Sequence, residues 1–125
     1  MAAARELQVQ IANEPGALGR ISELLGEHGI NIHGFAVWGA TAHLLVREPA
    51  KAAEILRDEG FELRVVDVLE LIVPDEPGNL AEIARALGEA GVNIDYSYTV
   101  SSTTRGAAAF VLAVADTDQA EQLLD

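Results

Sequence analysis

Hydrophobic and polar residues follow two periods along this chain, and their order predicts its elements. Near the start, apolar residues alternate with glutamines, which is the period of a half-buried strand; they are Leu7, Val9 and Ile11. After Pro15 and Gly16, apolar residues recur at the spacing of one helix face; they are Leu18, Ile21 and Leu25. The chain therefore opens with a strand, a turn and an amphipathic helix.

The same reading continues to the end of the chain. In the first half it predicts strands over 31–38, 42–47 and 61–68, with a helix over 50–58. In the second half it predicts strands over 69–73, 93–100 and 107–115, and helices from Leu80 and over 117–124. The resulting order is β-α-β-β-α-β, and two helices on one face of an antiparallel sheet is the compact arrangement for it. The alternation also predicts that Tyr96, Tyr98 and Trp38 face the helices.

The two halves show the same hydrophobic pattern because the sequence itself contains an internal repeat. The stretch NEPGALGRISELLGEHGINI (13–32) returns as DEPGNLAEIARALGEAGVNI (75–94). Two copies of one design predict two small units, residues 1–67 and 68–125, in place of one larger domain. We therefore expect an α+β protein of two ferredoxin-like βαββαβ units, with antiparallel sheets and the helices on one face.

The two copies differ at their ends. AEILRD (53–58) is followed by a further strand, whereas its counterpart AEQLLD (120–125) ends the sequence. Either the chain continues beyond Asp125, or the second unit lacks its last strand and leaves an open sheet edge, which sheets seldom tolerate unprotected.

Composition narrows the classes of partner. The net charge of −12 argues against nucleic acid and against an anionic membrane, because both require clustered Lys and Arg. No long apolar run indicates a signal peptide or a membrane span, so the sequence predicts a soluble, cytoplasmic protein. Units of about 60 residues are close to the lower limit for a self-sufficient core, and no cysteine is present to link them. We therefore expect the halves to pack on each other and the chain to form a homodimer.

The sequence offers little for catalysis or metal binding. His28, His33 and His43 lack the spacing and the carboxylate neighbours of a metal site. There is no cysteine nucleophile, and no serine stands in a recognisable arrangement with a base. The Pro-Gly turns lack the longer glycine run and the lysine of a phosphate loop. We therefore expect no cofactor and no enzymatic activity.

Two copies of (N/D)-x-P-G-x-L, each followed by G-(I/V)-N-I, resemble the tandem ACT-domain proteins, a family of small amino-acid-sensing regulators. The resemblance covers nearly the whole chain and is greatest to stand-alone proteins of two ACT units. It implies a ligand between two units, where the turn before the first helix of one faces the start of the second strand of the other. Carried over, it predicts the ligand-binding residues Asn13, Glu14, Gly16, Asn31, Asp75, Glu76, Gly78 and Asn93.

The chemistry of these residues suits a free amino acid. Unpaired N–H groups at a helix N-terminus bind a carboxylate, and a glycine there admits the ligand to the backbone. Asn31 can donate or accept a hydrogen bond, and Asp75 is suited to an ammonium group. The predicted pairings are Asp75 with Asn31 and Asn13 with Asn93. The alternative is that Asn13 and Asp75 only cap the turn or the helix.

These observations predict a regulatory protein that binds a small molecule, an amino acid first of all, at the junction of two ACT units. Occupancy would stabilise one arrangement or one oligomer over another. The competing interpretation is an oligomerisation or partner-interaction module that binds no ligand. A small enzyme is the third, and it rests only on the versatility of the fold.

Overall fold

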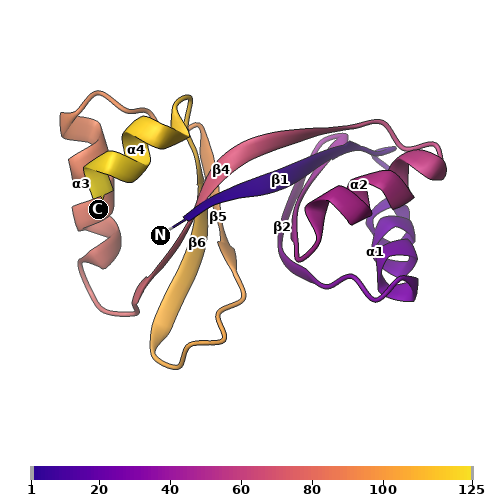
Figure 1. Ribbon diagram of the computed structural model, residues 1–125, viewed down its shortest axis with the longest axis horizontal. Coiled ribbons are helices and arrows are strands. Elements are labelled where there is room, and N and C mark those ends of the chain that lie inside the picture. Colours follow the sequence, from indigo (N-terminus) through magenta and orange to yellow (C-terminus); the bar gives the residue numbers. More distant parts are fainter. Residues whose placement is uncertain (1, 125) are drawn as a thin grey trace. The chain divides into compact units, whose positions relative to one another are not determined.

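A computed structural model of the chain describes residues 2–124, and Figure 1 shows its elements. In chain order they are β1 (Ala2–Gln10), α1 (Ala17–Glu27), β2 (Ile32–Trp38), β3 (Thr41–Val46), α2 (Pro49–Asp58), β4 (Leu63–Pro74), α3 (Asn79–Glu89), β5 (Tyr96–Val100), β6 (Ala107–Ala113) and α4 (Thr117–Leu124). This is the element order that the hydrophobic pattern predicts, except that two expected strands are fused into β4. None of these helices is both long and apolar enough to cross a membrane.

The described chain divides into two compact units. Residues 5–66 form one, which we call the N-unit, and residues 2–4 together with 67–124 form the other, the C-unit. Strands β1 and β4 therefore each contribute residues to both units. The start of β1 belongs to the C-unit, although it lies at the opposite end of the sequence.

The strand arrangement corrects the expected fold class. The six strands have the order β1-β3-β2-β5-β6-β4, and this order is that of a closed barrel. The expectation of two separate antiparallel sheets, the second lacking its last strand, is therefore wrong. The reason is that β4 runs from Leu63 to Pro74 without a breaking residue, and that β1 begins as early as Ala2. Within residues 2–124, closure leaves no strand with a free edge of the kind that promotes aggregation.

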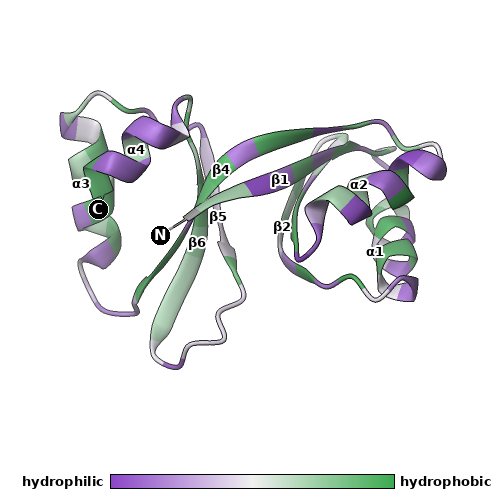
Figure 2. Ribbon diagram, in the orientation of Figure 1, coloured by the Kyte–Doolittle hydropathy of each residue, from purple (hydrophilic) through white to green (hydrophobic). Residues whose placement is uncertain are grey.

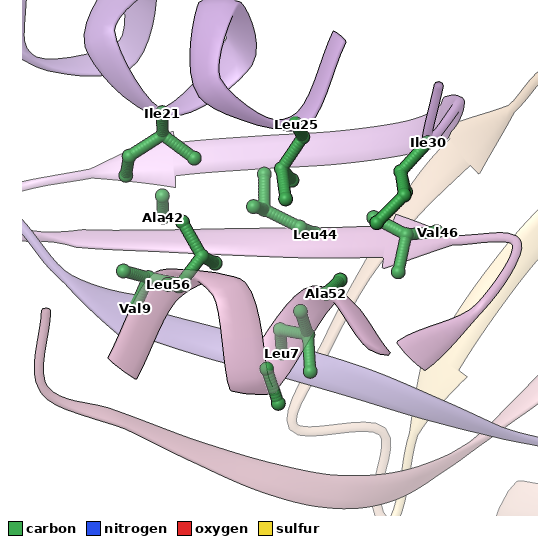
Figure 3. Packing of buried hydrophobic residues seen from close by; sticks show 11 residues of the cluster. Leu7, Val9, Ile21, Leu25, Ile30, Ala42, Leu44, Val46, Ala52 and Leu56 are labelled. Carbon is green, nitrogen blue, oxygen red and sulfur yellow. The ribbon is translucent and has the colours of Figure 1, made fainter. Parts of the chain in front are cut away.

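In the N-unit, helices α1 and α2 cover one face of the sheet. Figure 3 shows Ile21 and Leu25 pointing from α1 toward β3, where Ala42 lies near Ile21 and Leu44 near Leu25. The complete buried cluster is Leu7, Val9, Ile21, Leu25, Ile30, Ala42, Leu44, Val46, Ala52, Ala53 and Leu56. The helical spacing of its α1 members and the alternation of its strand members are the two periods visible in the sequence.

The C-unit repeats this arrangement with α3 and α4. Its buried cluster is Leu69, Leu71, Leu87, Phe110, Leu112, Val114 and Ala120. Figure 2 shows that all four helices carry both hydrophilic and hydrophobic residues, whereas β6 is hydrophobic along its length. The helices are thus amphipathic, with one stripe available for the core.

The predicted directions of three aromatic side chains are wrong. Tyr98 is paired with Val111, whereas its neighbour Ser97 is paired with Leu112 of the core, so Tyr98 lies on the sheet face away from the helices. Tyr96 shares that face, because β5 begins only at Tyr96 and its alternation does not continue from Ile94. In β2, a register shift between Ile32 and Gly34 reverses the alternation. Trp38 therefore also lies away from the helices.

A polar cluster lies on this other face of the N-unit. The Glu6 side chain is fully buried, and its Oε1 lies 2.9 Å from Nδ1 of the buried His43. The Gln8 amide donates to the same carboxylate oxygen at 3.1 Å. Trp38 stacks on the His43 ring, with centroids 4.0 Å apart. The face away from the helices is therefore specified by a hydrogen-bonded pair, not by apolar packing alone.

Candidate functional site

The turn before α1 carries three of the predicted site residues. Asn13, Glu14 and Gly16 are all exposed, and the Arg20 N–H donates to the Gly16 carbonyl at 3.0 Å to begin the helix. Gly16 is the N-cap and has φ of 88°, which lies in the left-handed region. Only glycine adopts this conformation readily, so the glycine of the Pro-Gly motif is required by the backbone.

The turn before α3 has the same construction. Asp75, Glu76 and Gly78 are exposed, and the Glu82 N–H donates to the Gly78 carbonyl at 3.0 Å. Gly78 has φ of 93°. The Asp75 N–H donates to the Gly106 carbonyl at 2.9 Å, which ties this turn to the loop before β6.

Neither helix is capped by a side chain. The N-cap residues Gly16 and Gly78 have no side chain, and no side-chain cap hydrogen bond forms at either helix. The alternative in which Asn13 and Asp75 cap the helices is therefore not seen. Each helix instead presents first-turn N–H groups and the positive end of its dipole at an exposed glycine, a local environment that favours an anionic group.

The two turns differ in charge at a position that the sequence analysis overlooked. In the first turn of α1, the Arg20 guanidinium lies 3.2 Å from the Glu14 carboxylate, and Nη1 of Arg20 lies 3.7 Å from where a Cβ on Gly16 would be. The repeat places Glu82 at the position of Arg20. A guanidinium therefore lies in the first turn of α1, whereas a carboxylate occupies the matching position in the first turn of α3. Arg20 can be found from the sequence by comparing the two copies of the repeat for positions where the charge is reversed.

The two predicted asparagines come just before β2 and β5, and both are exposed. The Asn31 carbonyl accepts the Arg47 N–H at 3.2 Å, which leaves its side chain outside the backbone pairing. The Asn93 amide instead donates to Asp95 Oδ1 at 2.9 Å. His33 stands where the repeat has Asp95, so Asn31 has no acidic neighbour at that position. The two asparagines are thus not chemically equivalent.

Asn31 also lines a pocket of about 350 Å³ within the N-unit. The pocket lies between α1 and β2, and its other lining residues are Leu18, Ser22, Gly26, Ile30, Ile32, Phe35 and Leu44. The volume is at the lower end of the range for small-molecule sites. Leu18 was expected only as a core residue, and no pocket was predicted at this place.

The pocket exists because the helices leave part of the sheet face uncovered. Phe35 is paired with the fully buried Leu44, and Val37 is paired with the fully buried Ala42. Phe35 and Val37 therefore project on the helix side of the sheet, yet they are 55% and 40% exposed. Phe35 forms one wall of the pocket and α1 forms the other.

The described residues give no support for a metal site. Across residues 2–124, no group of three or more His, Asp or Glu side chains could hold a metal ion. His43, one of the three histidines considered above, is engaged with Glu6. The predicted pairings of Asp75 with Asn31 and of Asn13 with Asn93 remain predictions.

Replacing Gly16 or Gly78 by alanine is expected to destabilise the protein by about 1–2 kcal/mol, because both glycines have left-handed backbones. An added Cβ would have space at both positions, so the cost would come from the backbone. The control is Gly19→Ala inside α1, which should raise the stability by up to about 1 kcal/mol. Urea denaturation measures all three; equal effects at Gly16 and Gly19 would contradict the conformational argument.

Comparison with known proteins places these features in a family context. A family profile described as an ACT domain pair matches residues 2–124. Among solved structures, protein BT0572 from Bacteroides thetaiotaomicron is similar with a TM-score of 0.89 and 27% identity, over 98% of this chain and 86% of that one. No curated protein matches the chain.

Two further structures share the fold at lower identity. The regulatory subunit of aspartate kinase from Thermus flavus has a TM-score of 0.67 and 18% identity, over 98% of this chain and 88% of that one. E. coli aspartokinase III, in complex with aspartate and ADP, has a TM-score of 0.62 and 16% identity, over 98% of this chain and 32% of that one. At these identities the likeness concerns the fold.

Proposed function

Because the chain belongs to the family of ACT domain pairs, whose domains are regulatory modules, we propose that it is a regulatory protein that binds a free amino acid. The observation that carries the proposal is the pair of exposed helix N-termini at Gly16 and Gly78, each built on a left-handed glycine and neither capped by a side chain. Backbone N–H groups at such a terminus can hold the carboxylate that every amino acid possesses.

The proposed binding residues are those of the two turns and the two strand starts. We assign the ammonium group of one ligand to Asp75 and its polar contacts to Asn31, the pairing that the family resemblance implies. The acidic surroundings of Asp75, which include Glu76 and Glu82 in the same turn and helix start, support a cationic group there. Asn13 and Asn93 form the second proposed pair, in which Arg20 would assist the carboxylate.

A thermal-unfolding screen against the proteinogenic amino acids at millimolar concentration tests the proposal. An amino acid at a hundred times its dissociation constant is expected to stabilise the fold by about 2.7 kcal/mol, which corresponds to several degrees in Tm. Asp75→Ala and Asn31→Ala should each reduce this shift. Asp118→Ala, which removes an exposed charge from α4, should leave it unchanged.

A flat screen across all amino acids would reject the proposal. If shifts occur but Asp75→Ala and Asn31→Ala retain them in full, the assignment of these two residues is wrong while amino-acid binding stands.

The second candidate is an interaction module without a ligand, and the exposed Phe35 and Val37 on β2 favour it. Apolar side chains adjacent on one strand form a surface suited to another subunit, and we propose a homodimer as its simplest form. Sedimentation of the wild type and of a Phe35→Ser/Val37→Ser variant distinguishes the two candidates. A dimer that dissociates in the variant and ignores every amino acid would favour the interaction module.

A further inference from the structure

The pocket beside Asn31 indicates which amino acids the proposed site would select. Three of its residues, Leu18, Ser22 and Gly26, are four apart on α1 and form one row along the helix. Their side chains become smaller along the row, from isobutyl to hydroxymethyl to hydrogen. The smallest member of the row, Gly26, shares the pocket lining with Ile30 and Asn31.

The walls of the pocket are apolar and uncharged. Leu18, Ile30, Ile32, Phe35 and Leu44 supply carbon surface, and the polar side chains are those of Ser22 and Asn31. The Ser22 hydroxyl already donates to the Leu18 carbonyl at 2.9 Å. A charged group placed here would lose its hydration without gaining an ionic partner among the lining residues.

The volume fits an aliphatic group of a few carbons. A cavity of about 150 Å³ lined by Leu, Ile and Phe can hold benzene, so about 350 Å³ leaves room for a branched alkyl chain and its attachment to a polar head. Asn31 supplies the polar contact on the lining, and it is the residue already proposed to bind the amino-acid backbone. The pocket thus offers a place for a side chain directly beside the place for the charged groups.

We infer that this pocket of the N-unit selects amino acids with aliphatic side chains of the valine, leucine and isoleucine class; the inference rests on the proposed function above. The C-unit is less suited to the same selection. Its corresponding row is Leu80, Ala84 and Gly88, but Ser97 stands where the N-unit has the Phe35 wall. The preference for an aliphatic side chain therefore belongs to the pocket beside Asn31.

Titration calorimetry of the full chain with glycine, alanine, valine, leucine, aspartate and lysine tests the inference. Each methylene placed in the pocket should tighten Kd by about fourfold, so leucine, with three more carbons, should bind about 60-fold more tightly than alanine. Aspartate and lysine should bind no more tightly than glycine.

Matched variants of α1 assign the preference to this pocket. Gly26→Leu adds a side chain at the pocket lining, where a Cβ meets nothing within 4 Å, and should weaken leucine binding at least tenfold while glycine binding is retained. Gly19→Leu, on the same helix and equally open at its Cβ, should bind leucine like the wild type. Gly26→Ala is the milder variant should Gly26→Leu fail to fold.

The outcomes separate the two proposals. Tightest binding of aspartate or lysine, or equal leucine affinity in the Gly26 and Gly19 variants, would overturn the aliphatic preference and leave amino-acid binding standing. Absence of binding by every amino acid would overturn the proposed function and the preference with it.

Discussion

Replacing Leu25 by alanine is expected to lower the free energy of unfolding by about 2–5 kcal/mol, because the truncation leaves a cavity in a packed core. Leu25 is fully buried on α1, and Leu87, its counterpart in the repeat, is equally buried on α3. We therefore expect Leu87→Ala to cost a similar amount. Leu80→Ala is the control, since Leu80 is 61% exposed and its truncation should cost less than about 0.5 kcal/mol.

The variants Leu25→Ala and Leu87→Ala also test the closed strand order. Strands β1 and β4 contribute residues to both units, so a loss of stability in either unit should shift one common unfolding transition. Trp38 is the single tryptophan and reports on the N-unit, whereas far-ultraviolet circular dichroism reports on both units. The two probes should give coincident urea transitions in Leu25→Ala and in Leu87→Ala. Two separated transitions in either variant would contradict the shared strands.

His43→Val is expected to cost about 3–5 kcal/mol, because it leaves the Glu6 carboxylate buried without the histidine as partner. Glu6 is fully buried and lies 2.9 Å from the His43 ring. Glu6→Val should cost less, about 1–3 kcal/mol, since it leaves a ring nitrogen and not a carboxylate without this hydrogen-bond partner. Urea denaturation of both single variants measures these values.

The repeat itself supplies the control for this pair. By strand register, the C-unit has Val68 at the position of Glu6 and Val111 at that of His43. The double variant Glu6→Val/His43→Val should therefore recover most of the stability that either single variant loses, because apolar groups can replace a buried polar pair at little cost. Additive losses would show that the two residues act independently.

The repeat and its periodicity are sufficient to predict the elements. A helix or strand that packs one face on a core shows this in its own sequence, whatever the rest of the chain does. This is why the pattern predicts the helical row Leu18, Ile21 and Leu25 and the alternating strand from Leu7 to Ile11. Both Pro-Gly turns were predicted for the same reason. Gly16 and Gly78 both have a left-handed backbone, which is a local property of these two positions.

The strand order depends on distant parts of the chain and was mispredicted. No local signal states that residues 2–4 belong to the C-unit, since they lie at the far end of the sequence from β6. The direction of Tyr98 failed because β5 begins only at Tyr96 and its alternation does not continue from Ile94. The direction of Trp38 failed for a related reason. One register shift near Ile32 reverses every later side chain of β2, and a period of two cannot reveal where such a shift occurs.

The candidate site was predictable in its polar parts and not in its apolar part. Asn13, Gly16, Asn31 and their copies stand out because a core does not require them. A simple alternation from Asn31 puts Phe35 and Val37 on the sheet face away from the helices, whereas the register shift turns them to the helix side. They are exposed there because of how α1 covers β2, which is a matter of packing. Arg20 could have been found, because the repeat reverses its charge at Glu82.

The most direct test of the account is an NMR titration of the full chain with leucine, which follows each backbone amide. Amino-acid binding at the proposed site predicts the largest shift changes at Asn31 and Ile32, at Gly26, and in the turn at 75–78. They should saturate with a single Kd and be absent with Gly26→Leu. Shift changes confined to residues outside these segments, such as α4, or no change at millimolar leucine and at millimolar concentrations of the other amino acids, would contradict the account.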